Sequence, residues 1–480
     1  MAPERRTRTR ARGACAGRPW AFLRLRTIHR KVSVLPLSKP PSPGGRSNQA
    51  PSAGRSILLL DCDAFFVQVA RREDPDGAGR AERLLVGGSS GRGVVTSASY
   101  AVRAFGVRSG MPVAEALRLC PDALVVPVPR GACVERSRAI RAELETLAPV
   151  VQAASIDEFY LDLTGTGRLF AGESLAQTAA RIRGRVHEAT GILVSVGGAT
   201  NRLVAKLAAG FAKPHATRAG GGGETGVFVV PPGREADFMA SLAVADIPGV
   251  GPALAGELEQ RGIVTVPDLL AVEPEWLARW VGEGRADWLR ERALGRDDSE
   301  VTAGEARKSI SAERTYGTDV PPGPAGNAEL EGRLLELSMS VGATLREKGF
   351  RARTITVKLR DADFSTRQRS HTLPEAVESD RAVYEVGRAM LRDLRARGRA
   401  TRLLGIGVAG FEDEAGVEQL DLIGPDEPGA PVRAESDRDR TLSRVADQVR
   451  ARFGDDAIRP GRVMEGRAER DSRRRESDES

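Results

Sequence analysis

The sequence predicts a multidomain protein in which an α/β unit is followed by a small helical unit and an α+β unit. Its 480 residues are too many for one hydrophobic core and suggest three or four units. Apolar strand-like runs alternate with helical patterns from residue 56 to about 220, which is typical of an α/β unit with a mixed sheet. After Gly304 alternating strand patterns stand beside helical ones, which indicates an α+β unit.

The elements of the first unit follow from short apolar runs and helical periodicity. Its predicted strands are 57–60, 93–97, 155–163 and 192–197, and its predicted helices are 64–71, 113–119 and 176–189. In the α+β unit we expect strands at 353–360 and 403–408 and helices at 329–348 and 376–397.

Composition places the unit boundaries. Residues 1–55 hold 13 Lys/Arg and one acid and are rich in Pro, Ser and Gly, so we expect a disordered basic extension. Such a segment also suits a mitochondrial transit peptide, although the Arg-, Ala- and Gly-rich composition of the whole chain favours a dispensable extension. The break at Pro231-Pro232-Gly233 then separates 56–230 from a helical unit at 231–304, an α+β unit at 305–411 and a flexible tail at 412–480.

Several protein classes are excluded or disfavoured by composition. No apolar run is long enough to span a membrane, so we expect a soluble protein. The four cysteines form no Cys-x-x-Cys pair, which argues against a zinc site or a disulfide framework and favours a reducing cytoplasm. Residues 306–410 carry 19 basic and 13 acidic side chains. This excess predicts a polyanionic partner, the alternative being a charged helix face of solvated arginines.

Three carboxylates lie in two apolar strands. Asp61 ends the run Ile57-Leu58-Leu59-Leu60, and Asp157 and Glu158 stand in the run from Ser155 to Leu163. Because burying a carboxylate without compensation costs several kcal/mol, acids that converge from two strands require positive charge nearby. A pair of Mg²⁺ ions would supply it, and the pattern predicts a phosphoryl-transfer site.

The motifs around these acids resemble one protein family. Asp-Cys-Asp-Ala-Phe-Phe at 61–66 and Ser-Ile-Asp-Glu-Phe-Tyr-Leu-Asp at 155–162 are similar to motifs of the Y-family translesion DNA polymerases, and the match runs from about 57 to 410. The resemblance implies a right-hand fold with palm and fingers in 56–230 (fingers about 67–130), a helix-hairpin-helix thumb and a little finger. It also implies low-fidelity, template-directed addition of dNTPs in damage tolerance, without a proofreading exonuclease.

The resemblance assigns roles to the first motif. Asp61 and Asp157 would bridge two Mg²⁺ ions, Glu158 would complete the primer-side site, and the carbonyl of Cys62 would add an oxygen. Asp63 and Asp162 match acids that are not primary ligands, so local hydrogen bonding is the better interpretation for both. Phe66 matches the steric gate that excludes a 2′-hydroxyl. A Phe pair beside a strand is otherwise more often core, and only the spacing from Asp61 reverses that.

Four further residues are predicted to bind the nucleotide. Tyr100 and Arg103 are three apart and would share a helical face, from which they could clamp β- and γ-phosphates; the alternative is a surface pair. By resemblance Lys213 reaches the triphosphate, and the small Ser97 lies near the nucleotide. Asn201 and Lys206 match positions that cap and pack the helix before Lys213, so we interpret both as structural.

DNA contacts are expected in the two later units. Gly249 and Gly251 fit a helix-hairpin-helix whose free backbone N–H groups bind a phosphate, although a Gly-rich turn without a ligand is equally compatible. The little-finger pattern predicts phosphate contacts along an exposed sheet from Lys308, Arg353, Lys358, Arg360 and Arg367.

The tail holds one short motif. Residues Gln419, Leu420, Leu422 and Ile423 resemble the peptide by which bacterial polymerases bind the sliding clamp, with Ile423 in place of the usual Phe. Chance matches of five residues are common, and the position after the little finger favours the clamp. The expected partners are therefore primer–template DNA, dNTPs and a sliding clamp, for a monomer without membrane association in the bacterial cytoplasm.

Two other functions compete with a polymerase. A catalytically silent relative could act as a scaffold for a DNA-repair complex, but such relatives lack the metal acids, whereas Asp61, Asp157 and Glu158 are all present. A nucleotidyl cyclase that shares the palm would not need the hairpin motif, the basic α+β unit or Phe66.

Overall fold

A five-stranded mixed sheet in the order β5-β6-β1-β7-β8 organises the first unit. The computed structural model describes residues 54–88, 91–168, 172–214, 225–304, 306–395, 398–413, 435–454 and 457–458. The strands of this sheet are β1 (Ile57–Cys62), β5 (Val150–Ala153), β6 (Glu158–Asp162), β7 (Val194–Ala199) and β8 (Val227–Val229). Both neighbours of β1 run antiparallel to it, and β8 runs parallel to β7.

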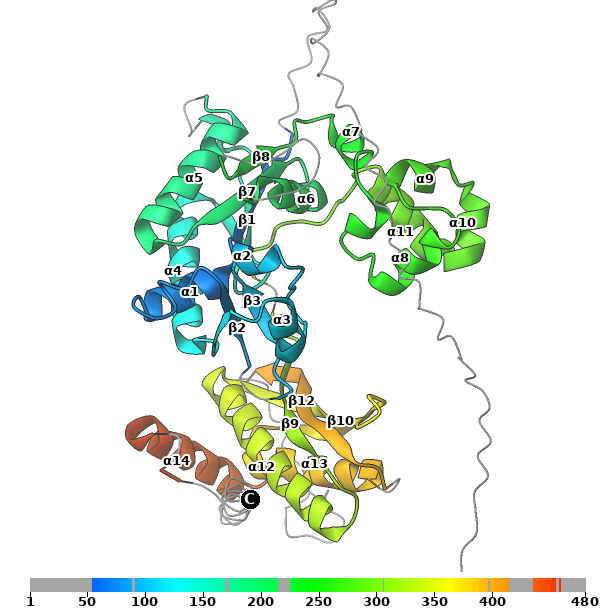
Figure 1. Ribbon diagram of the computed structural model, residues 1–480. Helices are drawn as coiled ribbons and strands as arrows, with labels where there is room; N and C mark the ends of the chain where they lie inside the picture. The colour runs from blue at the N-terminus through cyan, green and yellow to red at the C-terminus, as the bar shows by residue number, and fades with distance from the viewer. Residues whose placement is uncertain are drawn as a thin grey trace, which may run out of the picture.

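Helices cover both faces of this sheet because β1 is apolar on both sides. Ile57 and Leu59 pack in the cluster that contains α6 (Arg202–Ala212), whereas Leu58 and Leu60 pack in the cluster of α1 (Phe65–Glu73), α4 (Arg130–Leu147) and α5 (Leu175–Thr190). Figure 1 shows α6 and α5 on either side of β7. A continuous apolar run of this kind is typical of a strand buried on both faces.

A smaller sheet with its own core is inserted after α1. Its order is β3-β2-β4, and its elements are β2 (Leu84–Gly87), β3 (Val95–Ala98), α2 (Tyr100–Arg103), α3 (Val113–Leu119) and β4 (Leu124–Val126). It lies below the central sheet in Figure 1. After β6 a short 3₁₀ turn, η1 (Thr166–Arg168), leads towards α5.

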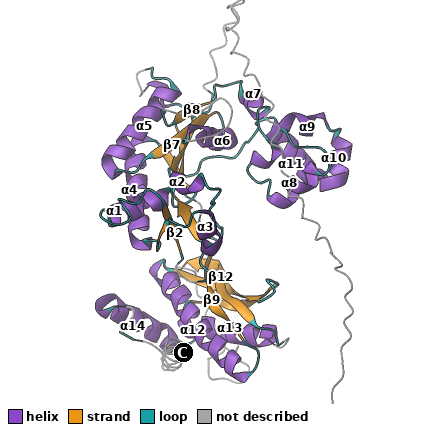
Figure 2. Cartoon of the chain, in the orientation of Figure 1, coloured by secondary structure: helices purple, strands orange, loops and turns teal. Residues whose placement is uncertain are grey.

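The helical unit at 231–304 contains helices and no strand among its described residues, in agreement with its predicted class. It stands apart to the right of the central sheet, as the colouring by secondary structure makes clear (Figure 2). Its elements are α7 (Glu235–Met239), η2 (Val244–Asp246), α8 (Pro252–Glu259), α9 (Val266–Ala271), α10 (Pro274–Val281) and α11 (Glu283–Ala293).

The α+β unit at 305–411 is a four-stranded antiparallel sheet with helices on one face. Its order is β11-β10-β12-β9, formed by β9 (Ser309–Val320), β10 (Phe350–Asp361), β11 (Thr366–Val377) and β12 (Thr401–Asp413). The helices α12 (Pro324–Glu347) and α13 (Asp380–Arg395) pack on the side where Ile355, Val357 and Leu359 are fully buried. The other face of the sheet carries polar side chains, as the period-2 pattern of a half-buried strand requires.

The prediction of a flexible tail from 412 to 480 is wrong for one segment. Residues Asp437–Phe453 form helix α14, which packs against α12 and α13 (Figure 1). The contact is largely polar: Arg346 on α12 bonds Asp447 at 2.6 Å, and Glu435 accepts the backbone N–H of Glu378 at 3.0 Å. Sequence periodicity missed this helix because it is bound through charges rather than through a wide apolar face.

Two expectations fall outside the described residues: the clamp-type peptide at 419–423 and nearly all of the basic extension at 1–55. Among the described residues, no helix is both long and apolar enough to cross a membrane.

Candidate active site

The pairing of β1 with β6 brings the three predicted carboxylates together. Asp61 lies opposite Glu158 in the register, and the backbone N–H of Cys62 donates to the carbonyl of Asp157 at 3.0 Å. The chain then turns sharply at Ala64, a non-glycine residue with φ 44° and ψ 49°. Such left-handed backbone at a non-glycine residue is costly and concentrates at functional sites. It starts α1 immediately beside the carboxylates.

Two lysines from one helix meet two of these acids. Lys206 donates to both oxygens of Glu158, at 2.9 and 2.7 Å, and Lys213, just after α6, lies 2.7 Å from Asp61. Lys206 lies within α6 and Lys213 is its C-cap, seven residues later, so both lysines come from the same side of the chain at this helix. The third acid, Asp157, instead accepts the hydroxyl of Ser155 at 2.5 Å.

The site holds more negative charge than the lysines balance. The pKa of Asp61 is raised to about 6, chiefly because the carboxyl is buried; Lys213 lowers it, and the nearby carboxylates of Glu158 and Asp157 add smaller increases. Burial likewise raises the pKa of the Cys62 thiol, which keeps it neutral. A buried carboxylate with a pKa this high indicates that an additional cation would be stabilised here.

The donor set fits a hard divalent cation by its chemistry. Carboxylate and carbonyl oxygens are the ligands of Mg²⁺, and Asp61, Asp157, Glu158 and the Cys62 backbone supply only such oxygens. No group of three acidic, His or Cys side chains within the described part of the chain is gathered closely enough to hold an ion as it stands. A cation bound here would compete with Lys206 for Glu158 and with Lys213 for Asp61.

The two phenylalanines after the first acids take different environments. Phe65 is 1% exposed and packs in the core of the central sheet, whereas Phe66 is only partly buried. Their rings meet edge to face with centroids 5.5 Å apart. Phe66 is therefore the ring that remains partly accessible beside the acidic site.

The Tyr100 hydroxyl on α2 reaches the same site, and Arg103 on that helix packs on the Tyr100 ring. The Arg103 guanidinium stacks 5.0 Å from the centre of the Tyr100 ring, so the predicted sharing of one helical side is confirmed. The Tyr100 hydroxyl lies 3.4 Å from Asp63, which also accepts the hydroxyl of Ser195 at 2.8 Å. Burial is the main cause that raises the pKa of both Asp63 and Tyr100. Ser97 is 4% exposed, in β3.

Sequence reasoning missed three of these contacts. Lys206 was expected to be structural, yet it forms the ion pair with Glu158; its spacing of seven from Lys213 was the available signal. Ser155 holds the Asp157 carboxylate, and Ser195 holds Asp63. The Ser155 contact is local, two residues from its partner, whereas the Ser195 contact depends on the pairing of β7 with β1 and left no signal in the sequence. Asp162 makes the local hydrogen bond that was expected, accepting the backbone N–H of Thr164 at 2.8 Å, whereas the partners of Asp63 are distant in sequence.

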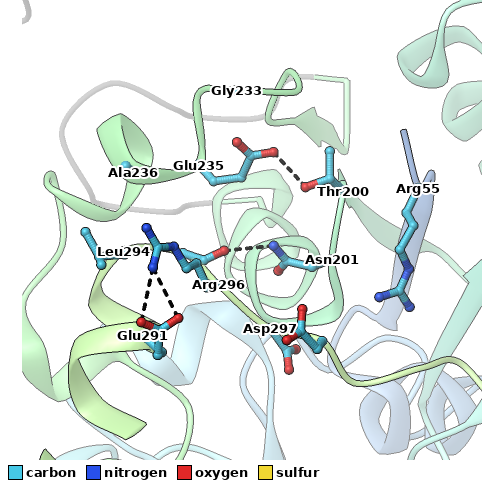
Figure 3. Close-up of a pocket in the computed structure, with 12 residues that line it drawn as sticks. Arg55, Thr200, Asn201, Gly233, Glu235, Ala236, Glu291, Leu294, Arg296 and Asp297 are labelled. Atoms are coloured by element: carbon cyan, nitrogen blue, oxygen red, sulfur yellow. Dashed lines mark hydrogen bonds and ion pairs between the residues drawn. The ribbon is translucent and has the colours of Figure 1, made fainter. Parts of the chain in front are cut away.

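A polar cavity of about 500 Å³ lies at the opposite end of α6, against the helical unit (Figure 3). Asn201, which caps α6, donates to the carbonyl of Gly295 at 2.8 Å, and Thr200 donates to Glu235 at 2.6 Å. Asp297 accepts the backbone N–H of Leu203 at 3.0 Å. These contacts connect the start of α6 to the helical unit, so the cavity lies between the two units. Lys213 of the acidic site lies at the other end of the helix.

The predicted DNA-contact residues of the α+β unit do not share one surface. Lys358 and Arg360 alternate with the buried Val357 and Leu359 and therefore lie on the open face of the sheet. Arg367 pairs with Leu359 on the helix side, where its guanidinium bonds both oxygens of the 2% exposed Asp361 side chain at 2.8 and 3.2 Å. The expectation that Arg367 lies along the exposed face is wrong, because the strand alternation places it on the helix-facing side.

The other predicted DNA-contact positions are Arg353 and Lys308 in the α+β unit and Gly249 and Gly251 in the helical unit. Arg353 donates to the carbonyl of Leu373 at 3.2 Å, and Lys308 lies in the exposed residues just before β9. In the helical unit Gly251 is the N-cap of α8, and Gly249 has φ 101° with no room for a Cβ, which would lie 2.7 Å from Trp288. A glycine is thus required at 249 on both grounds.

Comparison with known proteins gives a consistent result. Residues 60–210 match the impB/mucB/samB family, and residues 307–422 match the C-terminal domain of the same family. A DNA polymerase IV of Caulobacter vibrioides is 37% identical over 413 residues, which cover 86% of this chain and 95% of that protein. A DNA polymerase IV of Halorhodospira halophila is 38% identical over 371 residues, covering 76% and 98%.

Solved structures show the same fold. A Y-family DNA polymerase chimera, Dbh-Dpo4(243-245)-Dbh, superposes with a TM-score of 0.62 at 26% identity and covers 74% of this chain and 98% of the other. An insertion ternary complex of Dbh DNA polymerase gives a TM-score of 0.53 at the same identity and coverage.

Proposed function

The chain belongs to the impB/mucB/samB family, and we propose that it is a translesion DNA polymerase that extends a primer 3′ end with dNTPs under the direction of a template. Its fold is that of a Y-family polymerase, in which the central sheet is the palm, the three-stranded sheet the fingers, the helical unit the thumb and the α+β unit the little finger. The observation that carries the proposal is the meeting of Asp61, Asp157 and Glu158 on paired strands beside Lys213 and Tyr100.

Two Mg²⁺ ions are proposed for the metal site. When bound, they would lower the pKa of the primer 3′-hydroxyl and neutralise the triphosphate. Asp61 and Asp157 would hold both ions, with Glu158 on the primer side and the Cys62 carbonyl as a further oxygen. Supporting this, burial raises the pKa of Asp61 to about 6, so a cation bound beside this carboxylate would stabilise its charged form. Lys206 and Lys213 balance part of the negative charge of the site before the cations bind.

The nucleotide would be positioned by residues that flank this site. Lys213, released from Asp61, and the stacked pair of Tyr100 and Arg103 would bind the triphosphate oxygens. Phe66 would lie under the sugar and exclude a 2′-hydroxyl, and buried Ser97 would leave space beside the nucleotide. Catalysis would then rest on positioning and electrostatics.

The thumb and little finger would hold the DNA. Gly249 and Gly251 leave the start of α8 open to a phosphate, and Lys358, Arg360, Arg353 and Lys308 would contact the backbone without reading bases. We further propose that the protein binds a sliding clamp through Gln419, Leu420, Leu422 and Ile423. It would act as a monomer in the bacterial cytoplasm. A catalytically silent scaffold is the alternative, and the intact set of carboxylates disfavours it.

Primer extension on templated DNA with Mg²⁺ tests the function directly. Wild type should extend with dNTPs and hardly with rNTPs, and Asp157→Ala should abolish extension while DNA binding remains. Asp162→Ala is the matched control, because this acid on the same strand bonds the backbone of Thr164 and should leave extension unchanged. A folded wild type that binds DNA but does not extend the primer would favour the scaffold.

A further inference from the structure

The open face of the little-finger sheet is built mainly from small and hydroxyl-bearing residues rather than from cations. Two cross-strand rows on this face run Thr372, Thr354, Ala409, Ser309 and Ser370, Thr356, Gly407, Ser311. Hydroxyls in each row bond across the strands, at 3.0 Å between Thr354 and Thr372 and at 2.8 Å between Thr356 and Ser370. The net positive charge of the unit is therefore not concentrated in these rows.

The next row contains a lysine and a carboxylate. It runs Gln368, Lys358, Gly405, Glu313, so a glycine separates the two charged residues on adjacent strands. The Lys358 ammonium crosses the glycine and donates to Glu313 at 2.8 Å. A Cβ at position 405 would lie 2.9 Å from the Cβ of Glu313, so the absence of a side chain there is what lets the pair form.

This pair remains open to solvent. The Lys358 side chain is 32% exposed and that of Glu313 is 51% exposed. Ion pairs with such exposure are weak and readily exchange partners, so an approaching phosphate can compete with the carboxylate. Until that exchange occurs, the Glu313 carboxylate neutralises the positive charge of Lys358 on the face that approaches DNA.

We infer that Glu313 is an electrostatic restraint on DNA binding, which withholds Lys358 from the phosphate backbone until DNA displaces it across Gly405. The inference rests on the proposed function, in which this face contacts DNA. It adds to that function an acidic residue that limits DNA affinity, whereas the family resemblance predicts only lysines and arginines as DNA contacts in this unit. The result is a little finger whose hold on DNA is weaker than its lysines and arginines suggest.

A double-mutant cycle on the full chain tests the restraint. Dissociation constants for a fluorescent primer–template would be measured at several salt concentrations for wild type, Glu313→Gln, Lys358→Gln and the double variant. Glu313→Gln should tighten binding about three- to tenfold at about 0.1 M salt and steepen the log–log salt slope by about 1, since one more phosphate is neutralised. In the Lys358→Gln background the gain should fall below about twofold.

The matched control is Asp393→Asn on α13. Asp393 pairs with Arg369 at 2.6 Å, and both side chains are more than half exposed, but the pair lies on the helix side of the same unit. The same loss of one negative charge should leave DNA binding within about twofold of wild type, as for a surface substitution away from the contact.

Three results would overturn the inference. Glu313→Gln could bind DNA no tighter than wild type, it could give the same gain in both Lys358 backgrounds, or Asp393→Asn could match it. Failure of the proposed polymerase activity would look different: a wild type that binds primer–template without extending it leaves the binding cycle readable. A folded wild type that binds no primer–template even at low salt would overturn the inference as well.

Discussion

The palm and the little finger both pair lysines with carboxylates, but burial makes the two arrangements physically different. In the palm, the Asp61 and Glu158 side chains are 15% and 23% exposed, and they meet lysines from one helix. On the little-finger face, Glu313 is 51% exposed and meets a lysine of the same sheet. Desolvation dominates the first case and raises the pKa of Asp61 to about 6. Solvent screening dominates the second.

The difference in burial gives the two sets of charged residues different functional roles. Buried, under-compensated acids favour cation binding and can place charge where a reaction needs it, at a cost in stability. Exposed, balanced charges adjust how strongly and how salt-dependently a polyanion is held. Substitutions in the palm should therefore change chemistry, selectivity and stability, and those on the open sheet should change affinity.

Arg367→Leu tests whether burial rather than location decides the outcome. Although it belongs to the little finger, Arg367 binds the nearly inaccessible Asp361 with two hydrogen bonds. Losing it should cost about 3–5 kcal/mol of unfolding free energy, because a buried carboxylate loses its partner. Denaturant titration measures this, with Arg369→Leu, whose partner Asp393 is exposed, as a nearly neutral control. Normal stability combined with weakened DNA binding would contradict the buried assignment.

Phe66→Ala should change sugar selection at the palm edge. Removing the partly accessible ring leaves room for a 2′-hydroxyl, so discrimination between dNTPs and rNTPs should fall by about 10²-fold. Single-nucleotide incorporation kinetics measure the ratio. Phe65→Leu is the control: its ring is buried in the core, so stability should fall while selectivity persists. Equal selectivity losses in both variants would show that neither ring is specific to the sugar.

Asp61→Asn should stabilise the metal-free protein while it abolishes extension. The pKa of Asp61 is about 6 in the fold against 3.8 normally, so the folded state binds the proton more tightly and the wild type loses stability as pH rises from about 4 to 6. Asparagine removes this loss but also the Lys213 pair, which leaves a gain of about 1–3 kcal/mol above pH 6.

Denaturant titration in EDTA at pH 4 and pH 7 measures that gain. The advantage of the variant should be small at pH 4 and full at pH 7. A variant less stable than wild type at pH 7 would mean that Lys213 compensates Asp61 fully.

Arg360→Gln should give the smallest effect. Arg360 lies on the open sheet face and bonds the Thr366 hydroxyl at 2.9 Å, so it is accessible to a phosphate. DNA affinity should weaken about three- to tenfold at about 0.1 M salt, with a salt slope reduced by about 1 and an unchanged rate at saturating DNA. Fluorescence anisotropy measures the affinity and its salt slope, with Arg388→Gln on α13 as the control. A reduced extension rate at saturating DNA would show that Arg360 acts on the reaction in the palm and not only on DNA affinity.

Much of the fold followed from local patterns. The apolar run before Asp61 predicted β1, and the periodicity of 113–119 predicted α3. The motif spacing predicted that Asp61, Asp157 and Glu158 converge, and β1 and β6 bring them together. Helix α14 escaped prediction because Arg346, Asp447 and Glu435 attach it through partners distant in sequence.

By itself the sequence determined the class of the units and the family, and it predicted which three carboxylates come together in the palm. Only the tertiary structure decided which charges meet: Lys206 with Glu158, Arg367 with Asp361, and Lys358 with Glu313 across a glycine. The physical reason is that local patterns report backbone preference and burial face, whereas ion pairs depend on strand register and on which elements pack together. A one-residue change in register would reverse the face of Lys358 and of Arg367.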